Sequence, residues 1–318
     1  MAGFAPAGAC ASASTRPPSS AAMPYLIFIT FVWALSFNLI GEFIAGRVDS
    51  DFAVLTRVVL AGAAFLPFTR WRGVPAPLLW GTVAAGALQF GVTYLCLYRS
   101  YGYLTVPEVL LFTIFTPVYV TLLDDLLARR FNPWASVAAL VAVGGALIIR
   151  YGGLSGHFLT GFFLLQLANL TFAAGQVGYR RVVARYPSPW PAYRTFGFFF
   201  LGALAVALPS FLVFGNPAKL PATGLQWGVL AFMGLGASAL GFYFWNKGAC
   251  QVDAGTLGIM NNMHIPAGLT LSLLVWRHET DLGRLLAGGA VMGAALALNA
   301  WGRRRQERRG MAPVPAGR

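Results

Sequence analysis

Apolar stretches long enough to cross a lipid bilayer recur along the whole chain, and they constrain the fold more than any other feature. About 20 apolar residues in a helix span the hydrocarbon core, where an unpaired backbone finds no hydrogen-bond partner. A composition of 57% hydrophobic and 10% charged residues agrees with an all-α integral membrane protein. Ten transmembrane helices are expected, beginning near Pro24, Phe52, Pro77, Tyr103, Trp134, Phe158, Ala192, Leu225, Ala254 and Leu282.

The positive charges are distributed unevenly between the loops, and this asymmetry predicts the topology. With the N-terminus inside, fifteen Lys and Arg residues fall in inner loops and tails, and the outer loops hold six. The positive-inside rule therefore predicts that both termini are cytoplasmic. Membrane topology thus accounts for the excess of Lys and Arg behind the net charge of +13, and no nucleic-acid partner is expected. The outer cations are Arg47, Arg99, Arg150, Lys219, Arg277 and Arg284.

The chain ends carry no apolar segment of their own. Residues 1–23 are rich in Ala, Ser, Pro and Gly and are predicted to form a disordered tail, with Met23 a candidate for the true start codon. Residues 303–318 are predicted to form a basic cytoplasmic tail. The three Cys and three His residues are scattered in depth, so neither a disulfide, nor a metal centre, nor any cofactor is expected.

A faint internal repeat divides the chain into two halves, residues 24–150 and 155–302. At an offset of 149, Tyr94 corresponds to Tyr243 and Pro117 to Pro266, and a glycine-rich helix follows each proline. At slightly shorter offsets, Trp33 corresponds to Phe172 and Arg57 to Arg194. Because five helices are an odd number, the second half must enter the membrane inverted. Two inverted five-helix repeats are typical of secondary transporters, which bind substrate near the midplane between them.

The most informative stretch is QVDAGTLGIMNNMHIPAGL, residues 251–269, which places Asn261, Asn262 and His264 beside Pro266 within an apolar segment. Amides and an imidazole at this depth must face other helices or a wet cavity. Pro266 and Pro117 are both expected to break their helices. Two interpretations of the stretch stand: an interhelical clamp around a proline kink, or a substrate site.

Other polar residues are expected near the same depth, and each has an alternative role. Glu42 and Glu108 could simply be hydrated at the outer mouth, Arg57 and Arg194 could extend to the headgroups, and Trp245 could anchor at the interface. Asp124 and Asp125 are expected to pair with Arg129 or Arg130. The remaining residues of this kind are Trp33, Asn38, Gln89, Thr93, Tyr94, Gln166, Asn169 and Gln176.

Segments such as TFAAGQVGYRR and WNKGACQVDAG resemble the ten-helix drug/metabolite transporter (EamA-like) superfamily, whose unit is a duplicated five-helix domain. Within it the chain resembles the bacterial biotin transporter group, also described as carboxylate, amino acid and amine transporters. The matching stretches are residues 33–68, residues 103–125 and residues 251–269. The superfamily usually has an acidic residue about thirteen positions after the mid-helix proline. Glu279 fits this pattern, whereas Arg130 occupies the corresponding place in the first half.

The resemblance implies uptake of biotin across a bacterial inner membrane, with the bilayer and a small carboxylate substrate as partners. Asn261 and Asn262 offer donors and acceptors for the ureido ring, and Trp33 and Trp245 could wall the apolar part. Protonated His264 or Arg57 are alternatives for holding the carboxylate. Asn38, Gln89 and Tyr94 complete the expected substrate site.

The sequence specifies neither the coupling ion nor the direction of transport. Glu42 or Glu108 could carry a coupling proton, and a plain facilitator explains the sequence equally well. The chain lacks an ATP-binding loop, so it is not a primary pump by itself. Export of amino acids, amines or drugs is the alternative within transport. A membrane-embedded enzyme is not expected, because no nucleophile and base are clustered.

Overall fold

A computed structural model of the chain describes residues 22–127, 156–252, 254–276 and 282–310, with a few isolated positions between 134 and 148. The predicted disordered tail, residues 1–23, therefore lies outside the described residues except for its last two. Most of the expected fifth segment, which begins at Trp134, also lies outside them, as do Arg129, Arg130 and Glu279.

The described residues of the first half form four helical segments, and all four change helix type along their length. These are α1 (Ala22–Leu39) with η2 (Ile40–Ile44); α2 (Ser50–Phe65) with η3 (Leu66–Phe68); α3 (Ala76–Gly86), η4 (Ala87–Val92) and α4 (Thr93–Ser100); and α5 (Val106–Phe112), η5 (Thr113–Phe115) and α6 (Thr116–Leu127). Of the η elements, η2 and η4 are π-helical, whereas η3 and η5 are 3₁₀ turns.

The described residues of the second half are also helical, with longer uninterrupted helices. Its elements are α8 (Gly156–Arg185), α9 (Tyr193–Phe214), the 3₁₀ turn η6 (Pro217–Lys219), α10 (Gly224–Ala231), the π-helical η7 (Phe232–Leu240), α11 (Gly241–Ala249), α12 (Ala254–Leu274) and α13 (Leu282–Gly310). Helix α13 continues through Arg303–Arg305 to Gly310, so the predicted basic tail begins as part of a helix rather than after it.

Seven helices in the described part of the chain are long and apolar enough to cross a membrane. They are Pro24–Ile44, Ser50–Phe68, Ala76–Ser100, Val106–Leu127, His157–Arg185, Tyr193–Phe214 and Gly224–Ala249. Helices α12 and α13 begin at Ala254 and Leu282, where the ninth and tenth segments are expected. The prediction of an all-α, multi-pass membrane fold is thus confirmed.

Helix boundaries follow from local hydrogen-bonding chemistry. The Asp49 side chain accepts a hydrogen bond from the Phe52 amide at 2.8 Å and caps α2. Thr105 and Glu108 form a capping box at the start of α5, and Thr223 and Gln226 form one at the start of α10. These polar residues satisfy backbone amides that each helix leaves unpaired at its first turn, so they fix where the segments enter the bilayer.

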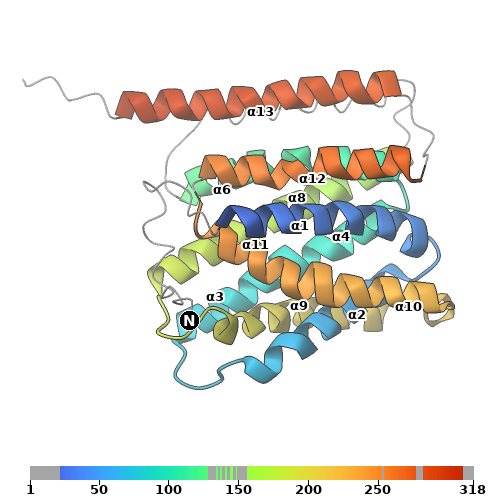
Figure 1. Cartoon of the computed structure of the whole chain (residues 1–318), viewed down its shortest axis with the longest axis vertical. Helices are drawn as coiled ribbons and strands as arrows, with labels where there is room; N and C mark the ends of the chain where they lie inside the picture. Colours follow the sequence, from blue (N-terminus) through green and yellow to red (C-terminus); the bar gives the residue numbers. More distant parts are fainter. Residues whose placement is uncertain are drawn as a thin grey trace, which may run out of the picture.

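The helices pack side by side, with α13 lying along one edge (Figure 1). The contacts between elements come in reciprocal pairs. Helix α3 packs on α9 while α2 packs on η7, and α4 packs on α8 while α11 packs on α1. Similarly, α1 packs on α12 and α6 packs on α8. Among the described residues, these contacts therefore match in three pairs under the predicted repeat.

Helices α3 and α9 approach so closely that glycine is required at their contact. A Cβ on Gly86 would collide with the carbonyl oxygen of Phe199, and one on Gly202 would collide with that of Val83. In lipid, where apolar surface gains little from leaving the solvent, such close backbone packing is a main source of helix association.

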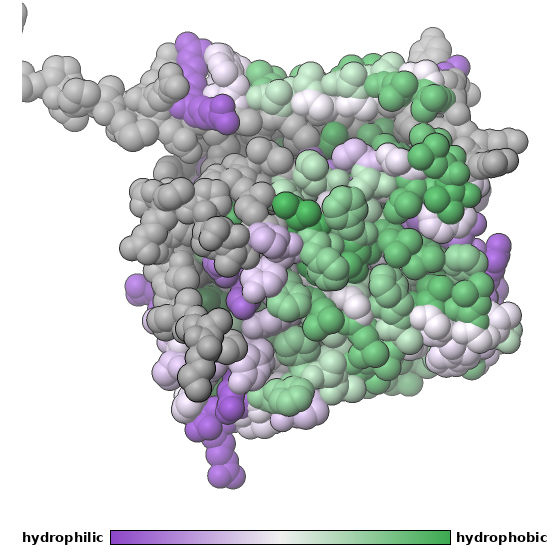
Figure 2. Space-filling model, in the orientation of Figure 1, coloured by the Kyte–Doolittle hydropathy of each residue, from purple (hydrophilic) through white to green (hydrophobic). Residues whose placement is uncertain are grey.

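The outer surface matches a bilayer environment. Figure 2 shows hydrophobic residues over the middle of the helices and hydrophilic residues gathered toward their ends. Helix α9 exposes Leu212, Val213 and Phe214 but buries Phe196, Phe199 and Phe200 against its neighbours. Helix α9 is therefore buried toward its start and exposed at its end.

One local prediction is wrong, and another stays a prediction. Asp124 forms an ion pair with Arg181 of α8, at 2.9 Å, because α6 and α8 are packed together; the predicted partners Arg129 and Arg130 lie outside the described residues. Helix α12 continues through Pro266 without a break, since a helix can tolerate the loss of one backbone hydrogen bond when its neighbours hold it. Pro117, by contrast, lies in the first turn of α6, directly after the 3₁₀ turn η5.

Candidate functional site

Two hollows stand out among the described residues, and they differ in kind. The larger, about 510 Å³, is an open hollow at the helix ends, between the loop around Thr69 and the start of α9. Its walls include Arg70, Arg72 and Arg194, and the Arg70 guanidinium lies 3.9 Å from the centre of the Trp190 ring. Cations beside aromatic rings at helix ends are typical of a membrane interface, so we do not assign a substrate to it.

The smaller hollow lies inside the helix bundle and brings both halves of the chain together. We call it the central cavity. Its volume is about 50 Å³, and α1, α4, η5, α6, α8 and α12 all contribute to it. Its lining residues are Trp33, Phe37, Thr93, Tyr94, Leu97, Thr113, Thr116, Leu165, Ala168, Asn169, Phe172, Asn261 and His264.

An aromatic cluster forms one wall of the central cavity. The Trp33 ring lies 5.9 Å from Phe172, 5.6 Å from Phe242 and 4.7 Å from Trp245, measured between ring centroids. Trp33 also donates its indole N–H to the Ala237 carbonyl oxygen at 3.0 Å, which links α1 to η7. Trp33 and Phe172 are the residues that the sequence repeat relates to each other, and here they are in contact.

A second wall is polar and largely satisfied internally. The Thr93 hydroxyl lies 2.9 Å from that of Thr171 and donates to the Leu88 carbonyl oxygen at 2.8 Å. Asn169 donates to the Phe112 carbonyl oxygen at 2.9 Å and accepts from Thr116 at 3.3 Å. These bonds hold α4, α5, α6 and α8 together around the cavity, so this wall is positioned before any ligand arrives.

His264 is held in a fixed orientation at the cavity. Its ring stacks on Phe37 at 5.1 Å, and its Nε2 lies 3.1 Å from the Thr113 hydroxyl oxygen. That hydroxyl also donates to the Leu110 carbonyl oxygen at 2.6 Å, so Thr113 connects the imidazole on α12 to the backbone of α5.

Asn261 presents the unused donor of the site. It is 4% exposed, lines the cavity, and its Nδ2 is buried without a hydrogen-bond partner. Asn262 is half-buried and does not line the cavity, and both polar atoms of its amide are also buried without a partner. Successive residues of a helix point about 100° apart, so only one of the two amides faces the hollow.

Several residues predicted for the site lie elsewhere. Asn38 is a clamp, because its Nδ2 donates at 3.0 Å to the carbonyl oxygens of Ala34 and Gly268 and ties α1 to α12. Gln89, on η4, is fully buried and does not line the cavity. Trp245 is 1% exposed and packs behind Trp33, so its alternative role as an interfacial anchor is wrong.

The charged residues predicted for this region also lie outside the cavity lining. Glu108 accepts hydrogen bonds from the Thr105 amide and hydroxyl in the capping box of α5, and Glu42 is half-buried on η2. Arg57 is fully buried, so the expectation that it extends to the headgroups is wrong, whereas Arg194 is exposed. In the part of the chain that the structure describes, no group of His, Cys, Asp and Glu residues could hold a metal ion.

Sequence reasoning singled out four of the cavity-lining residues as substrate-binding candidates: Trp33, Tyr94, Asn261 and His264. It did not select Thr113 or Thr116, whose hydroxyls lie beside Pro117 at the helix-type change, and this proximity to a mid-helix proline is the signal that could have found them.

The chain matches one protein family twice. The EamA-like transporter family matches residues 20–151 and again residues 159–300. A solved crystal structure shares the fold, with a TM-score of 0.64 and 19% sequence identity, over 90% of this chain and 99% of that one.

Curated relatives are similar over most of their length. A Pseudomonas aeruginosa protein named "Probable biotin transporter" is 64% identical over 282 residues, which are 89% of this chain and 99% of that protein. The proteins named "Biotin transporter" in Escherichia coli K12 and Salmonella typhimurium are each 48% identical over 275 residues, 86% of this chain and 91% of theirs.

Proposed function

Because the chain belongs to the EamA-like transporter family, it is a multi-pass membrane transporter, and we propose that it carries biotin into the cell across a bacterial inner membrane. Transport is secondary, by alternating access of the central cavity to the two sides. The central cavity is the proposed substrate site, shared by the two halves of the chain.

We propose that the two halves are inverted five-helix repeats, residues 24–150 and 155–302, with both termini cytoplasmic. The two family matches and the reciprocal helix contacts support this arrangement. So does the recurrence of π-helix in the third and eighth segments, because the 149-residue offset carries residues 87–92 onto 236–241, which overlap η7. The contact between Trp33 and Phe172 is expected where equivalent residues meet at a two-fold axis.

The observation that carries the substrate proposal is the unpartnered Asn261 amide in an otherwise aromatic and satisfied cavity. Biotin has a ureido ring that both donates and accepts hydrogen bonds, an apolar fused ring and an alkyl chain that ends in a carboxylate. The Asn261 Nδ2 group suits the ureido oxygen. Trp33 and Phe172 suit the apolar ring.

The central cavity is too small in this structure to hold biotin. A volume of about 50 Å³ holds a few waters, whereas pockets for ligands of this size usually have at least about 300 Å³. We therefore propose that the central cavity is contracted in this structure, and that side chains or helices move apart to admit biotin.

The experiment that tests the function uses a biotin-requiring bacterial strain that lacks its own biotin transporter. Expression of this chain is expected to restore growth at limiting biotin and to give saturable accumulation of radiolabelled biotin. Excess unlabelled biotin should abolish the accumulation, and excess unrelated amino acids should not. Growth and accumulation no better than with empty vector, in cells whose membranes contain the protein, would overturn the proposal.

Asn261→Ala is expected to raise the KM for biotin about 3-fold to 10-fold, because one hydrogen bond of about 0.5–1.5 kcal/mol is lost from the bound state. Uptake kinetics and membrane-inserted protein are measured together. The matched control is Asn262→Ala, the neighbouring amide that does not line the cavity, for which a change within about twofold is expected. Equal effects of the two substitutions would remove Asn261 from the site.

A further inference from the structure

A fully buried arginine lies one side chain away from the central cavity. Arg57, on α2, has 0% of its surface exposed, although an arginine inside a membrane protein is costly unless its charge is compensated. Its repeat-related counterpart in sequence, Arg194, is exposed at the start of α9. The burial of Arg57 is therefore not a property that both repeats share.

The partners of Arg57 are neutral. Its Nε donates to the Ser238 hydroxyl at 3.0 Å, and its Nη1 donates to the Tyr98 hydroxyl at 3.0 Å. The guanidinium carbon lies 4.2 Å from the centre of the Tyr94 ring, with the Phe90 and Tyr98 rings at 5.9 and 5.7 Å. Its Nη2 is buried without a hydrogen-bond partner.

No carboxylate pairs with Arg57 among the residues that the structure describes. Elsewhere the same chain does supply such partners: Arg99 pairs with Asp51 at 2.7 Å, and Arg181 pairs with Asp124 at 2.9 Å. Both of those arginines are partly exposed and need a counterion less than Arg57 does. Contact with aromatic faces offsets only part of the cost of burying a cation.

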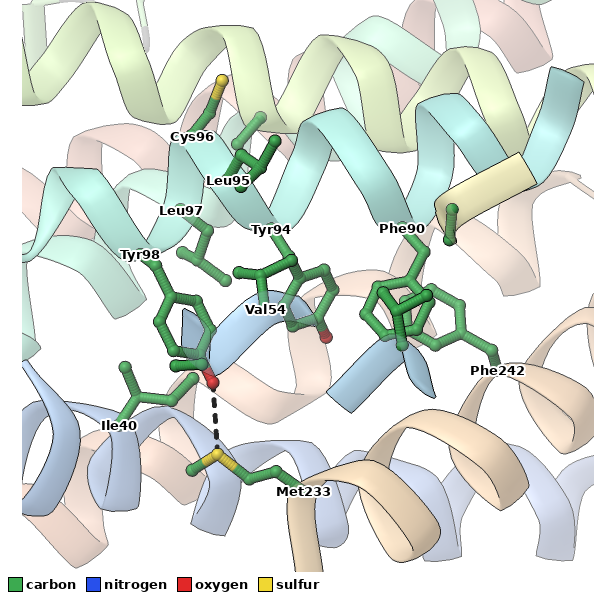
Figure 3. Close-up of a cluster of buried hydrophobic side chains, with 14 of the residues drawn as sticks. Ile40, Val54, Phe90, Tyr94, Leu95, Cys96, Leu97, Tyr98, Met233 and Phe242 are labelled. Carbon is green, nitrogen blue, oxygen red and sulfur yellow. Dashed lines mark hydrogen bonds between the residues drawn. The ribbon is translucent and has the colours of Figure 1, made fainter. Parts of the chain in front are cut away.

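Tyr94 separates this buried cation from the central cavity. Its ring faces the Arg57 guanidinium on one side and lines the cavity on the other. Figure 3 shows the side chains of Phe90, Tyr94 and Tyr98 extending from the same side of η4 and α4. Val54, on the same helix as Arg57, lies beside Tyr94 in that view, and Tyr98 reaches Met233. A displaced Tyr94 ring would join the space around Arg57 to the cavity.

We propose that Arg57 is the binding residue for the carboxylate of the substrate, reached when the Tyr94 ring moves aside. This inference rests on the proposed function. The free Nη2 and the guanidinium fork then take a carboxylate in place of the aromatic face, with the Tyr98 and Ser238 hydroxyls holding the fork in position. Occupation of the subsite adds the missing counterion and, at the same time, enlarges the small cavity.

The substrate site then has two chemically different ends. The ureido head lies at the Asn261 side, the fused ring lies against Trp33, and the carboxylate lies beyond Tyr94, with the alkyl chain along Leu97. A transporter built in this way selects apolar molecules that end in an anion and discriminates against their uncharged derivatives, because a neutral end group would leave the Arg57 charge without a partner.

The test compares biotin with biotinamide, which differs only in carrying a neutral carboxamide at the chain end. Uptake of each is measured in proteoliposomes containing the full-length chain. The native protein is expected to favour biotin. Arg57→Gln is expected to raise the KM for biotin about 30-fold or more, as loss of a buried charge pair does, while changing the KM for biotinamide less than about twofold. Arg57→Lys, which keeps the charge, is expected to retain part of the preference.

Arg194→Gln is the matched control, because it removes the repeat-related arginine from an exposed position, and it is expected to change neither KM. Equal loss of biotin and biotinamide uptake in Arg57→Gln would show that Arg57 is only structural and would overturn the inference. If Arg57→Gln does not insert into the membrane, the native protein alone still tests the role of Arg57. Equal KM values for biotin and biotinamide in the native protein would contradict the proposal. Failure of the proposed function looks different, because the native protein would then transport neither compound.

Discussion

Replacing Trp33 with alanine is expected to lower biotin uptake by at least about an order of magnitude. Removing a buried tryptophan costs about 3–5 kcal/mol of stability, and here the lost ring is also a wall of the central cavity. The truncation further breaks the hydrogen bond to the Ala237 carbonyl oxygen, which joins α1 to the second half of the chain. Uptake of radiolabelled biotin is measured per unit of membrane-inserted protein, with the thermal stability of detergent-solubilised protein measured beside it.

Two control variants accompany Trp33→Ala. Trp33→Phe keeps an aromatic wall but has no N–H to donate, so it is expected to retain most of the uptake at reduced stability. Trp227→Ala removes a tryptophan that is 47% exposed and does not line the cavity, so little effect on uptake is expected. Normal uptake by Trp33→Ala would contradict the assignment of this cavity as the substrate path.

Gly86→Ala is expected to remove most of the correctly folded protein from the membrane. The added methyl group would collide with the Phe199 carbonyl oxygen, and because that oxygen belongs to the backbone, the two helices must move apart. Overpacking costs about 1–3 kcal/mol where side chains can adjust, and a backbone collision lies at or above the upper end of that range. The loss of monodisperse protein after solubilisation measures the effect.

Gly178→Ala provides the matched control for this prediction. No heavy atom outside its own turn of helix lies within 4 Å of the position that its Cβ would occupy, although Gly178 belongs to the same bundle on α8. Alanine also favours a helix over glycine by about 1 kcal/mol, so the variant is expected to fold at least as well as the native protein. Equal yields of Gly86→Ala and Gly178→Ala would show that α3 and α9 are not packed as closely as described.

The fold class and the helix positions could be predicted because the bilayer imposes a length on every segment. The same argument gives the depth of a polar residue along its helix, which is why Asn261, His264 and Trp33 were expected at one level and do line one cavity. Depth does not say which way a side chain points. Asn261 and Asn262 are equivalent by depth, and only the packed structure separates them.

The errors share that physical cause. Arg57 and Trp245 were given alternative roles at the interface because each lies toward the end of an apolar segment, yet both are buried by neighbouring helices distant in sequence. Asn38 was expected at the substrate, but its amide is used to tie α1 to α12. Which polar side chains are used up by contacts between helices depends on tertiary packing, and periodicity along one segment carries no information about it.

Counterflow in proteoliposomes is the measurement that tests the central claim most directly. Liposomes that contain only the purified chain are loaded with unlabelled biotin and diluted into a trace of radiolabelled biotin. A secondary transporter exchanges the two whatever its coupling ion, so the label is expected to accumulate transiently inside, and to do so far less with Trp33→Ala. Label that enters no faster than into protein-free liposomes would contradict the account.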